Sequence, residues 1–207
     1  DDVHRPRPIP MPSSLTLERV ALIACSPRHT LVLSCMGNVY VCGENTEGAL
    51  GLGDLFARDR LTLLQWPEGK GADALTAPPK IAKIAAGSGT IGGHSMCIDA
   101  AGKLYGWGVP QASGHGTLKP VLSPRLITTF PSDITERHSA AQMEAREVEE
   151  DEDTEGAAND EEIFLRGGAQ VWRECADVAC GGGFTVAVLK DGRVCSWGMW
   201  SHGRVGQ

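Results

Sequence analysis

The chain has 207 residues and a formal charge of −7 at pH 7, and its apolar fraction of 42% is enough for a packed core, which excludes a disordered chain. Its 26 glycines and 12 prolines make up about 18% of the residues, against roughly 12% in an average protein. So much glycine without a Gly-X-Y period excludes a long-helix bundle and a collagen-like rod, and it indicates many tight turns.

The first predicted element after a proline-rich lead segment at 1–19 is a β-hairpin. Residues 30–34 form a short apolar run rich in β-branched side chains, a turn with Gly37 follows, and residues 39–42 form a second run. Two such runs joined by a glycine turn are typical of a hairpin. The segment that follows the hairpin is rich in glycine, and we call it the return. At Gly43, Gly48 and Gly51 we expect the backbone to pass close to a neighbour or to take positive φ.

The same unit recurs twice more along the chain. In each copy the middle glycine lies eight positions after the first residue of the unit. The glycine that ends the last strand lies six positions after the middle one. The recurring positions are His29, Gly37, Gly43 and Gly51, then His94, Gly102, Trp107, Gly108 and Gly116, then Gly192, Trp197, Gly198 and Gly206. Agreement at several offsets identifies an internal repeat. A residue that recurs once per copy has a repeated structural role, so we expect His29 and His94 to join neighbouring units rather than to catalyse.

Other motifs carry weaker signals. Residues 87–92 spell the G-x-G-x-x-G of a dinucleotide site, but a strand follows the glycines where that site needs a helix, so a long turn is the better interpretation. Cys175 and Cys180 are the nearest pair for a zinc site, yet their spacing is one residue too long and no second pair completes them. Cys25 and Cys180 are equivalent in the repeat, which disfavours a single nucleophile. Trp66 and Trp200 lie outside the repeat positions and are candidates for surface contacts. We expect no cofactor and no metal.

The acidic excess is confined to one insertion between the second and third copies. Residues 144–162 hold eleven acids and one base, so the rest of the chain is nearly neutral. Residues 139–149 contain good helix formers, whereas the acids after them oppose the helix dipole. The insertion, at about 123–170, is therefore expected to be partly helical and then a solvated loop. A second hypothesis is an acidic arm that docks on a basic partner through Glu149, Glu150, Asp151, Glu152 and Asp153.

The three copies resemble the regulator of chromosome condensation repeat. Residues 43–54 are a close copy of the end of that repeat, and residues 196–198 match its centre. The resemblance covers about 20–54, 81–118 and 175–207. Cys42 stands where the other copies have tryptophan, Phe184 replaces the histidine, and residues 114–116 are a degraded end of the return.

The resemblance implies an all-β fold, a partial β-propeller of about three RCC-type blades at residues 20–207. Propellers of this family have seven blades, so three repeats do not close a ring. We therefore expect a part of a longer propeller, or a partial one completed by another chain.

Two functions fit this fold. The first is a non-enzymatic protein-interaction scaffold within a larger protein or assembly, with other proteins or further blades as partners. The alternative is a guanine-nucleotide exchange factor for a small Ran-like GTPase, which would need no catalytic side chain visible in a motif. Nucleic acid and membranes are not expected partners, because basic clusters and long apolar runs are lacking. Seven cysteines, an odd number, favour a reducing intracellular compartment. Within the cell, we expect a cytoplasmic or cytoskeletal location rather than a nuclear one.

Overall fold

The computed structural model describes residues 5–6, 8–67, 77–90, 92–128, 130 and 173–199. The chain divides into two compact units, residues 1–127 with 173–207 and residues 128–172. Nearly all of the second unit, including the acids at 149–153 and the helix expected at 139–149, lies outside the described residues. Every described strand belongs to the first unit.

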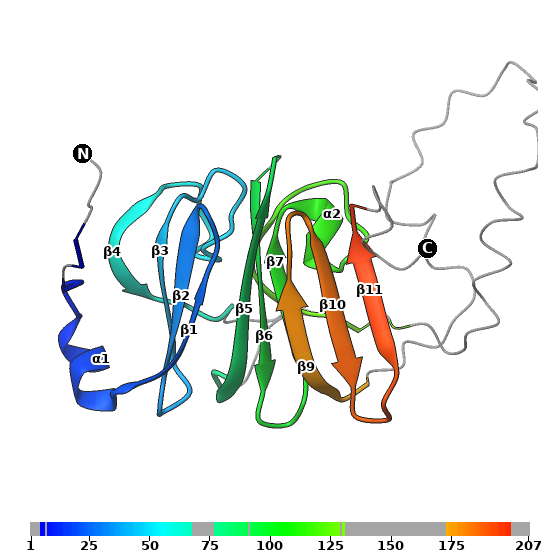
Figure 1. The fold of residues 1–207 in the computed structure, drawn as a ribbon, viewed down its shortest axis with the longest axis horizontal. Coiled ribbons are helices and arrows are strands. Elements are labelled where there is room, and N and C mark those ends of the chain that lie inside the picture. The colour runs from blue at the N-terminus through cyan, green and yellow to red at the C-terminus, as the bar shows by residue number, and fades with distance from the viewer. Residues whose placement is uncertain are drawn as a thin grey trace, which may run out of the picture. The chain divides into compact units, whose positions relative to one another are not determined.

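The described strands form three antiparallel sheets that stand side by side, and we call them blades 1, 2 and 3 (Figure 1). Blade 1 consists of β1 (Val20–Cys25), β2 (His29–Ser34), β3 (Val39–Gly43) and β4 (Arg58–Leu63). Blade 2 consists of β5 (Ile81–Gly89), β6 (Gly92–Asp99), β7 (Leu104–Gly108) and β8 (Val121–Leu126). Blade 3 has β9 (Cys175–Cys180), β10 (Phe184–Leu189) and β11 (Val194–Gly198).

In each blade, consecutive strands pair in order, and the first strand of a blade contacts the blade before it. Strand β5 packs against β1 and β2, and β9 packs against β5 and β6. Such a row of antiparallel meanders, two of four strands and one with three described strands, is the architecture of a β-propeller. The prediction of an all-β, partial propeller of about three blades is therefore confirmed. Strand β8 takes in the first residues of the insertion expected from 123 onward, and it gives blade 2 its fourth strand.

The three predicted hairpins have the same turn. Gly37, Gly102 and Gly192 have φ values of 91°, 84° and 87°, a left-handed conformation that residues with a Cβ rarely adopt. The amide of each donates a hydrogen bond of 2.9–3.0 Å to the carbonyl three residues earlier. Glycine at these positions therefore fixes where each hairpin reverses.

The largest core lies between blades 1 and 2. Because alternate residues of a strand point to opposite faces, Leu31 and Leu33 face blade 2 whereas Val32 faces away from it. Blade 2 has a neighbour on each side, and every residue of β6 and β7 is buried. The buried members of this core are Leu31, Leu33, Val39, Val41, Leu50, Leu64, Ile81, Cys97, Tyr105 and Trp107.

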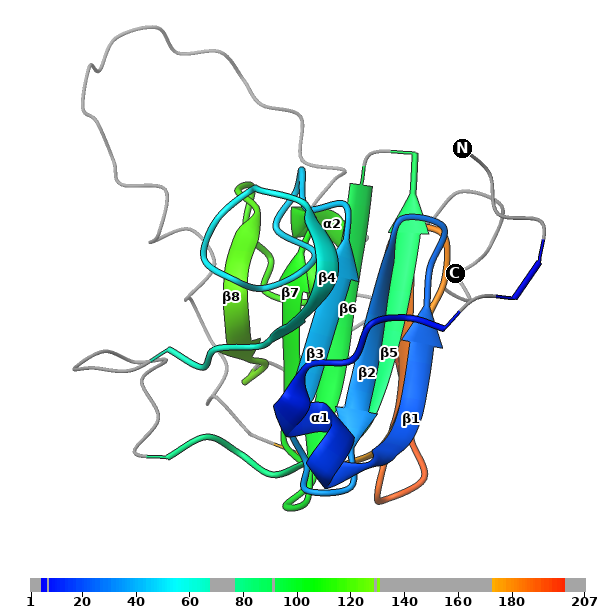
Figure 2. The ribbon, with the colours of Figure 1, turned by 90° about the vertical axis from the view of Figure 1, so that its left-hand side faces the viewer.

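The other face of blade 1 is partly covered by a short helix from the lead segment, α1 (Ser13–Glu18). Its Leu15 is fully buried against Val32, Tyr40 and Leu61. Figure 2 shows α1 lying across one end of this sheet, near the β2–β3 turn. The lead segment is thus not only a leader to the repeats, because its last part packs on the first of them.

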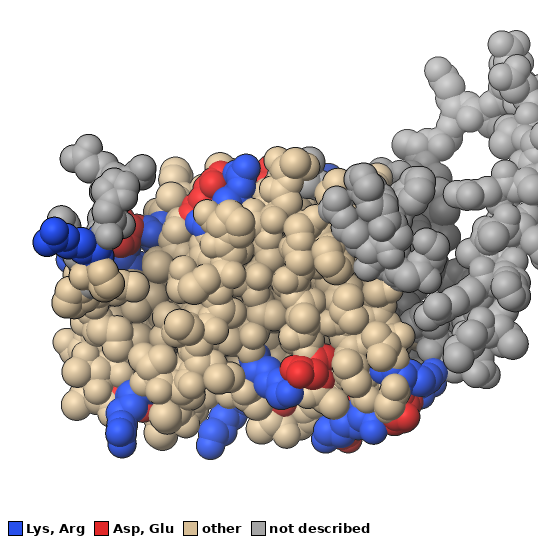
Figure 3. Space-filling model, in the orientation of Figure 1, with Lys and Arg blue, Asp and Glu red and all other residues tan. Residues whose placement is uncertain are grey.

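The charged residues of the first unit gather toward the two rims of the stack. On the face drawn in Figure 3, a wide uncharged area lies between them, over β1 and parts of β5 and β9, and the exposed ion pair of Lys83 in β5 with Asp177 in β9 borders it. Strand β1 contributes exposed Leu22 and Ile23 to this area. Among the helices in the described ranges, none is long and apolar enough to cross a membrane.

Candidate functional site

Blades 1 and 2 are joined by a hydrogen-bonded clamp built from recurring residues. The carbonyl of Ala49, in the return of blade 1, accepts one hydrogen bond from Trp107 Nε1 and one from Ser95 Oγ, both of 2.8 Å. Ser95 Oγ also lies 2.8 Å from His29 Nε2. Because the Ser95 hydroxyl donates to Ala49, it accepts from the imidazole, which fixes the proton of neutral His29 on Nε2. Both blades therefore contribute donors and acceptors to one buried network.

The surroundings of His29 keep it neutral. Burial lowers the pKa of this imidazole to about 4, outweighing the main chain of His94 and the charge of Glu44, which act in the opposite direction. Ser26 Oγ lies 2.9 Å from Nδ1 and completes the second ring contact. A neutral, doubly hydrogen-bonded histidine is suited to holding two blades together.

Blades 2 and 3 repeat the clamp with one contact missing. The carbonyl of Ala112 accepts from Trp197 Nε1 at 2.9 Å and from Thr185 Oγ1 at 3.1 Å. His94 occupies the position of His29 and is fully buried, but neither of its ring nitrogens has a hydrogen-bond partner among the described residues. Burial, with a smaller effect from His29, lowers the pKa of His94 to about 4, while the nearby Phe184 main chain acts weakly the other way. The second clamp therefore has fewer polar contacts than the first.

The two returns align with a constant offset of 63 residues. Ala49 and Ala112 are the carbonyl acceptors, Gly51 and Gly114 lie against the indole nitrogens of the clamp tryptophans, and the Leu64 and Ile127 amides bond equivalent carbonyls of the third strands. In the second return the glycine beside the tryptophan is thus Gly114, two residues before the Gly116 that the sequence pairs with Gly51. The second return is shorter and contains the helical turn α2 (Pro110–Ser113).

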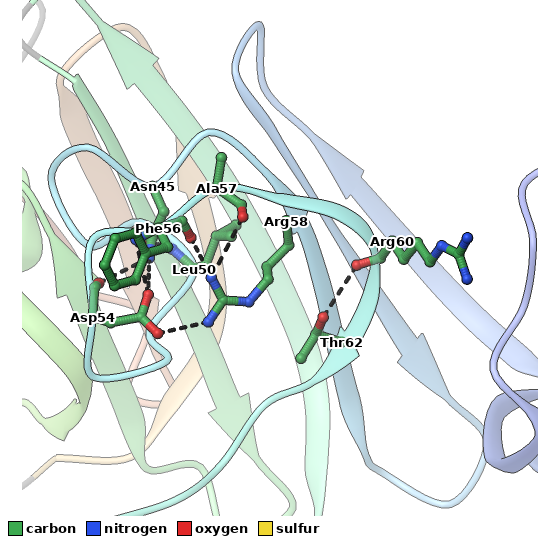
Figure 4. A network of polar contacts seen from close by, with 8 residues as sticks. All are labelled: Asn45, Leu50, Asp54, Phe56, Ala57, Arg58, Arg60 and Thr62. Carbon is green, nitrogen blue, oxygen red and sulfur yellow. Dashed lines mark hydrogen bonds and ion pairs between the residues drawn. The ribbon is translucent and has the colours of Figure 1, made fainter.

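The first return is locked by a polar network around buried Asn45 (Figure 4). Asn45 Nδ2 donates to the carbonyl of Asp54 at 2.8 Å, and Asn45 Oδ1 accepts from the Leu50 amide at 2.9 Å. Arg58 reaches back across the loop, and its Nη2 lies 2.6 Å from Asp54 Oδ2. Hydrogen bonds from Arg58 and from the Phe56 amide lower the pKa of Asp54. Asn45 and Asp54 thereby close the loop at both ends.

Removal of the Asn45 side chain is expected to loosen this return. In Asn45→Ala the buried Leu50 amide and the Asp54 carbonyl lose their partners, which costs about 1–3 kcal/mol of unfolding free energy. Thr46→Ala is the matched control, because Thr46 is exposed and bonds only the Glu44 side chain, so its cost should stay below about 0.5 kcal/mol. Urea unfolding of both variants measures the difference, and equal midpoints would contradict this role of Asn45.

The other positions singled out in the sequence either have a place in the strands and core or lie outside the described residues. Gly43, Gly108 and Gly198 end the third strands, where they pair with the second strands at His29, His94 and Phe184. Gly206, Trp200 and the acids at 149–153 lie outside the described residues. Trp66 is partly buried, and its ring packs edge-on against Tyr105, with centroids 5.1 Å apart.

The weaker chemical motifs are part of the blades. Residues 87–92 form the ends of β5 and β6 and the turn between them, and a Cβ at Gly87 would meet the Gly181 carbonyl of blade 3 at 2.6 Å. These glycines therefore permit blades to approach closely. Cys175 and Cys180 are the two ends of one extended strand, about 16 Å apart, so they cannot share a metal ion. Burial raises the pKa of Cys180 to about 12, which keeps it a thiol.

A pocket lies at one rim, where the turns between the first and second strands of the three blades converge. It has a volume of about 500 Å³. Its lining includes Arg28 from blade 1, Ser88 and Thr90 from blade 2, and Gly182 and Met199 from blade 3. Arg28 is held by Glu44 at 2.8 Å. With one guanidinium among its lining residues, this pocket is a second candidate contact surface.

Two functional features were missed in the sequence. The Asn45–Asp54–Arg58 network joins residues of a segment that we had interpreted only through its glycines, although an Asn and an Asp nine residues apart at the ends of the return were a readable signal. Exposed Leu55 and Phe56, at the tip of the same return, had no periodic pattern to mark them.

Comparisons with known proteins agree on the repeat and the fold. Residues 20–49 match the family model described as the regulator of chromosome condensation (RCC1) repeat. The chain is 28% identical to Protein RCC2 of Mus musculus over 99% of its own length and 34% of the relative. It is 37% identical to the human X-linked retinitis pigmentosa GTPase regulator over 52% of its own length and 9% of that protein. Yeast RCC1 (Prp20), solved bound to Kap60, superposes with a TM-score of 0.57 at 20% identity, over 90% of this chain and 34% of the other. The chain thus spans a third or less of these proteins.

Proposed function

Because this chain is built of RCC1-type repeats, we propose that it is a protein-interaction scaffold that works within a larger propeller or assembly. The observation that carries the proposal is the use of the recurring polar residues. His29, Ser95 and Trp107 are all committed to the contact between blades. These contacts hold the blades in a stack, and the returns lie at its surface, where a partner can reach them.

Further blades are one class of partner. The face of blade 1 that points away from blade 2 is only partly covered by α1, and it carries Thr30 and Cys42. These two residues are equivalent to Ser95 and Trp107, through which blade 2 contacts blade 1. Thr30 is partly exposed, and neighbouring Ile23 is 68% exposed. An apolar sheet face of this kind favours association. Light scattering of purified residues 1–207 tests it: a stable monomer with one cooperative melting transition would contradict the need for further blades.

The acidic insertion is a second proposed contact, for a basic partner. A partner should first be identified by retention on the immobilised full chain, then purified and titrated against the wild-type chain and a chain lacking residues 144–162. Docking through the acids predicts weaker binding by the shortened chain and a strong dependence on salt. Equal affinity for both chains would remove the insertion from the interface and leave the scaffold proposal in place.

Guanine-nucleotide exchange on a small Ran-like GTPase is the alternative function. It is favoured by one specific observation, the 37% identity over 108 residues to a protein named as a GTPase regulator. Release of a fluorescent guanine nucleotide from purified small GTPases measures this activity. Under the scaffold proposal we expect release at the intrinsic rate, and acceleration by the chain would establish exchange instead.

A further inference from the structure

From its first return, we infer that the chain binds a partner protein through Phe56 and Leu55, which insert into an apolar pocket of that partner. We call these two residues the apical pair. Phe56 is 74% and Leu55 50% exposed, so a large apolar area is open to contact. This inference rests on the proposed scaffold function and names the surface and the kind of partner.

The main chain of Phe56 is already hydrogen-bonded within the loop. The Phe56 amide donates to Asp54 Oδ1 at 2.9 Å, and the Phe56 carbonyl accepts from Arg58 Nη1 at 2.6 Å. Figure 4 shows Arg58 crossing the loop toward Asp54, while Arg60 points away from it. At Phe56 the phenyl ring is therefore the group left to interact, and a partner gains by burying it rather than by pairing with the main chain.

The loop that carries the pair is preorganised. Asn45 and Arg58 hold its two ends, and the Gly53 amide donates to the Leu122 carbonyl of β8 at 2.9 Å. Little conformational freedom is then lost on binding, which is the condition under which one aromatic residue contributes strongly to affinity.

The neighbouring return repeats the feature. By the offset of 63 residues, Leu118 is the counterpart of Leu55, and it is 92% exposed. Figure 2 shows the first return between β4 and β8, the outermost strands of blades 1 and 2. Exposed apolar side chains thus recur at equivalent positions in the returns of two blades.

Another blade of the stack does not fit as the occupant. The return already contacts its own blade and the next one, and it lies on the strands farthest from β1 and β5, where the blades approach one another. A membrane surface fits poorly as well. Two acids and two arginines, Asp54, Arg58, Asp59 and Arg60, surround the pair, so it lacks the basic excess that attracts anionic lipid. A separate protein with an apolar pocket is the partner that remains.

Phe56→Ala in the full chain tests the inference against a purified partner identified by its retention on the wild-type chain. We expect the dissociation constant, measured by calorimetry, to rise at least about 30-fold, as for an aromatic hot spot. Met36→Ala is the matched control, because Met36 is 63% exposed at the opposite rim, and it should change affinity less than about threefold. The melting temperature of both variants should equal that of the wild type, since neither side chain is buried.

Three outcomes overturn the inference in distinguishable ways. A partner that binds Phe56→Ala as tightly as wild type refutes the apical pair and leaves the scaffold function intact. Absence of any stable partner removes the scaffold function and this inference together. Phe56-dependent sedimentation with vesicles of phosphatidylcholine and 30% phosphatidylserine, or Phe56-dependent self-association in ultracentrifugation, assigns the pair to a membrane or to a second copy instead.

Discussion

Trp107→Ala is expected to lower the free energy of unfolding by about 3–5 kcal/mol, the usual cost of emptying a buried tryptophan site. Trp107 is fully buried in the core between blades 1 and 2, and its indole donates to the Ala49 carbonyl. The change removes packing against both blades at once. Since small domains have only about 5–15 kcal/mol of stability, urea unfolding should show a much lower midpoint.

Two further variants separate packing from hydrogen bonding. Trp107→Phe keeps most of the volume, and Ser95 still donates to Ala49, so we expect a loss of only about 1–2 kcal/mol. Trp197→Ala alters the equivalent clamp at blade 3, where the tryptophan is only partly buried, and it should cost less than Trp107→Ala. If Trp107→Ala and Trp197→Ala lowered the free energy of unfolding equally, the extent to which the tryptophan is buried between blades would not determine the loss.

Mild acid is expected to destabilise the blade stack. His29 and His94 have pKa values near 4 in the folded chain, against about 6.5 for an unfolded histidine, so between these values the unfolded state binds more protons. Stability is therefore complete above pH 6.5 and falls as the pH drops toward 4. Each histidine should cost about 2 kcal/mol between pH 6.5 and 5. Urea midpoints measured at pH 7, 6 and 5 give the slope.

Replacing His94 isolates its share of the acid effect. His94→Leu removes two buried ring nitrogens without hydrogen-bond partners, so we expect unchanged or higher stability at pH 7 and about half the slope below pH 6.5. His29→Gln should also halve the slope but lower stability at pH 7, because it disturbs the bond to Ser95. A full slope in both variants would contradict the assignment of this acid effect to the two histidines.

The repeated part of the fold was predictable because glycine reports backbone geometry directly. Gly37, Gly102 and Gly192 recur at fixed offsets, and each takes the left-handed turn that makes the hairpin. The resemblance to the regulator of chromosome condensation repeat is confirmed by the matching model over residues 20–49. The fourth strands β4 and β8 were not predicted, since they differ from each other in sequence, and they gain their strand structure by pairing with β3 and β7.

The contacts between blades were predictable in kind but not in detail. A histidine recurring once per copy indicated an inter-blade hydrogen bond, and His29 makes one. That His94 makes none depends on the exact placement of blade 3, which the sequence of blade 2 does not carry. The register of the second return was likewise hidden, because α2 shortens the path to Gly114. The apical pair carries no period at all, and only its exposure identifies it.

The clamp between blades has a direction. The carbonyl comes from the return of the earlier blade, Ala49 or Ala112, and the indole comes from the later one, Trp107 or Trp197. Neighbouring blades are therefore related head to tail. A blade can be gained or lost without a change in this contact, provided that it brings one indole donor and one carbonyl acceptor. In blade 1, Cys42 stands at the position of these tryptophans, so this blade has no indole that could bond the return of a blade before it. The described row is thus asymmetric: its two junctions, between blades 1 and 2 and between blades 2 and 3, each have the indole bond, whereas a blade placed before blade 1 would have to pack against it without one.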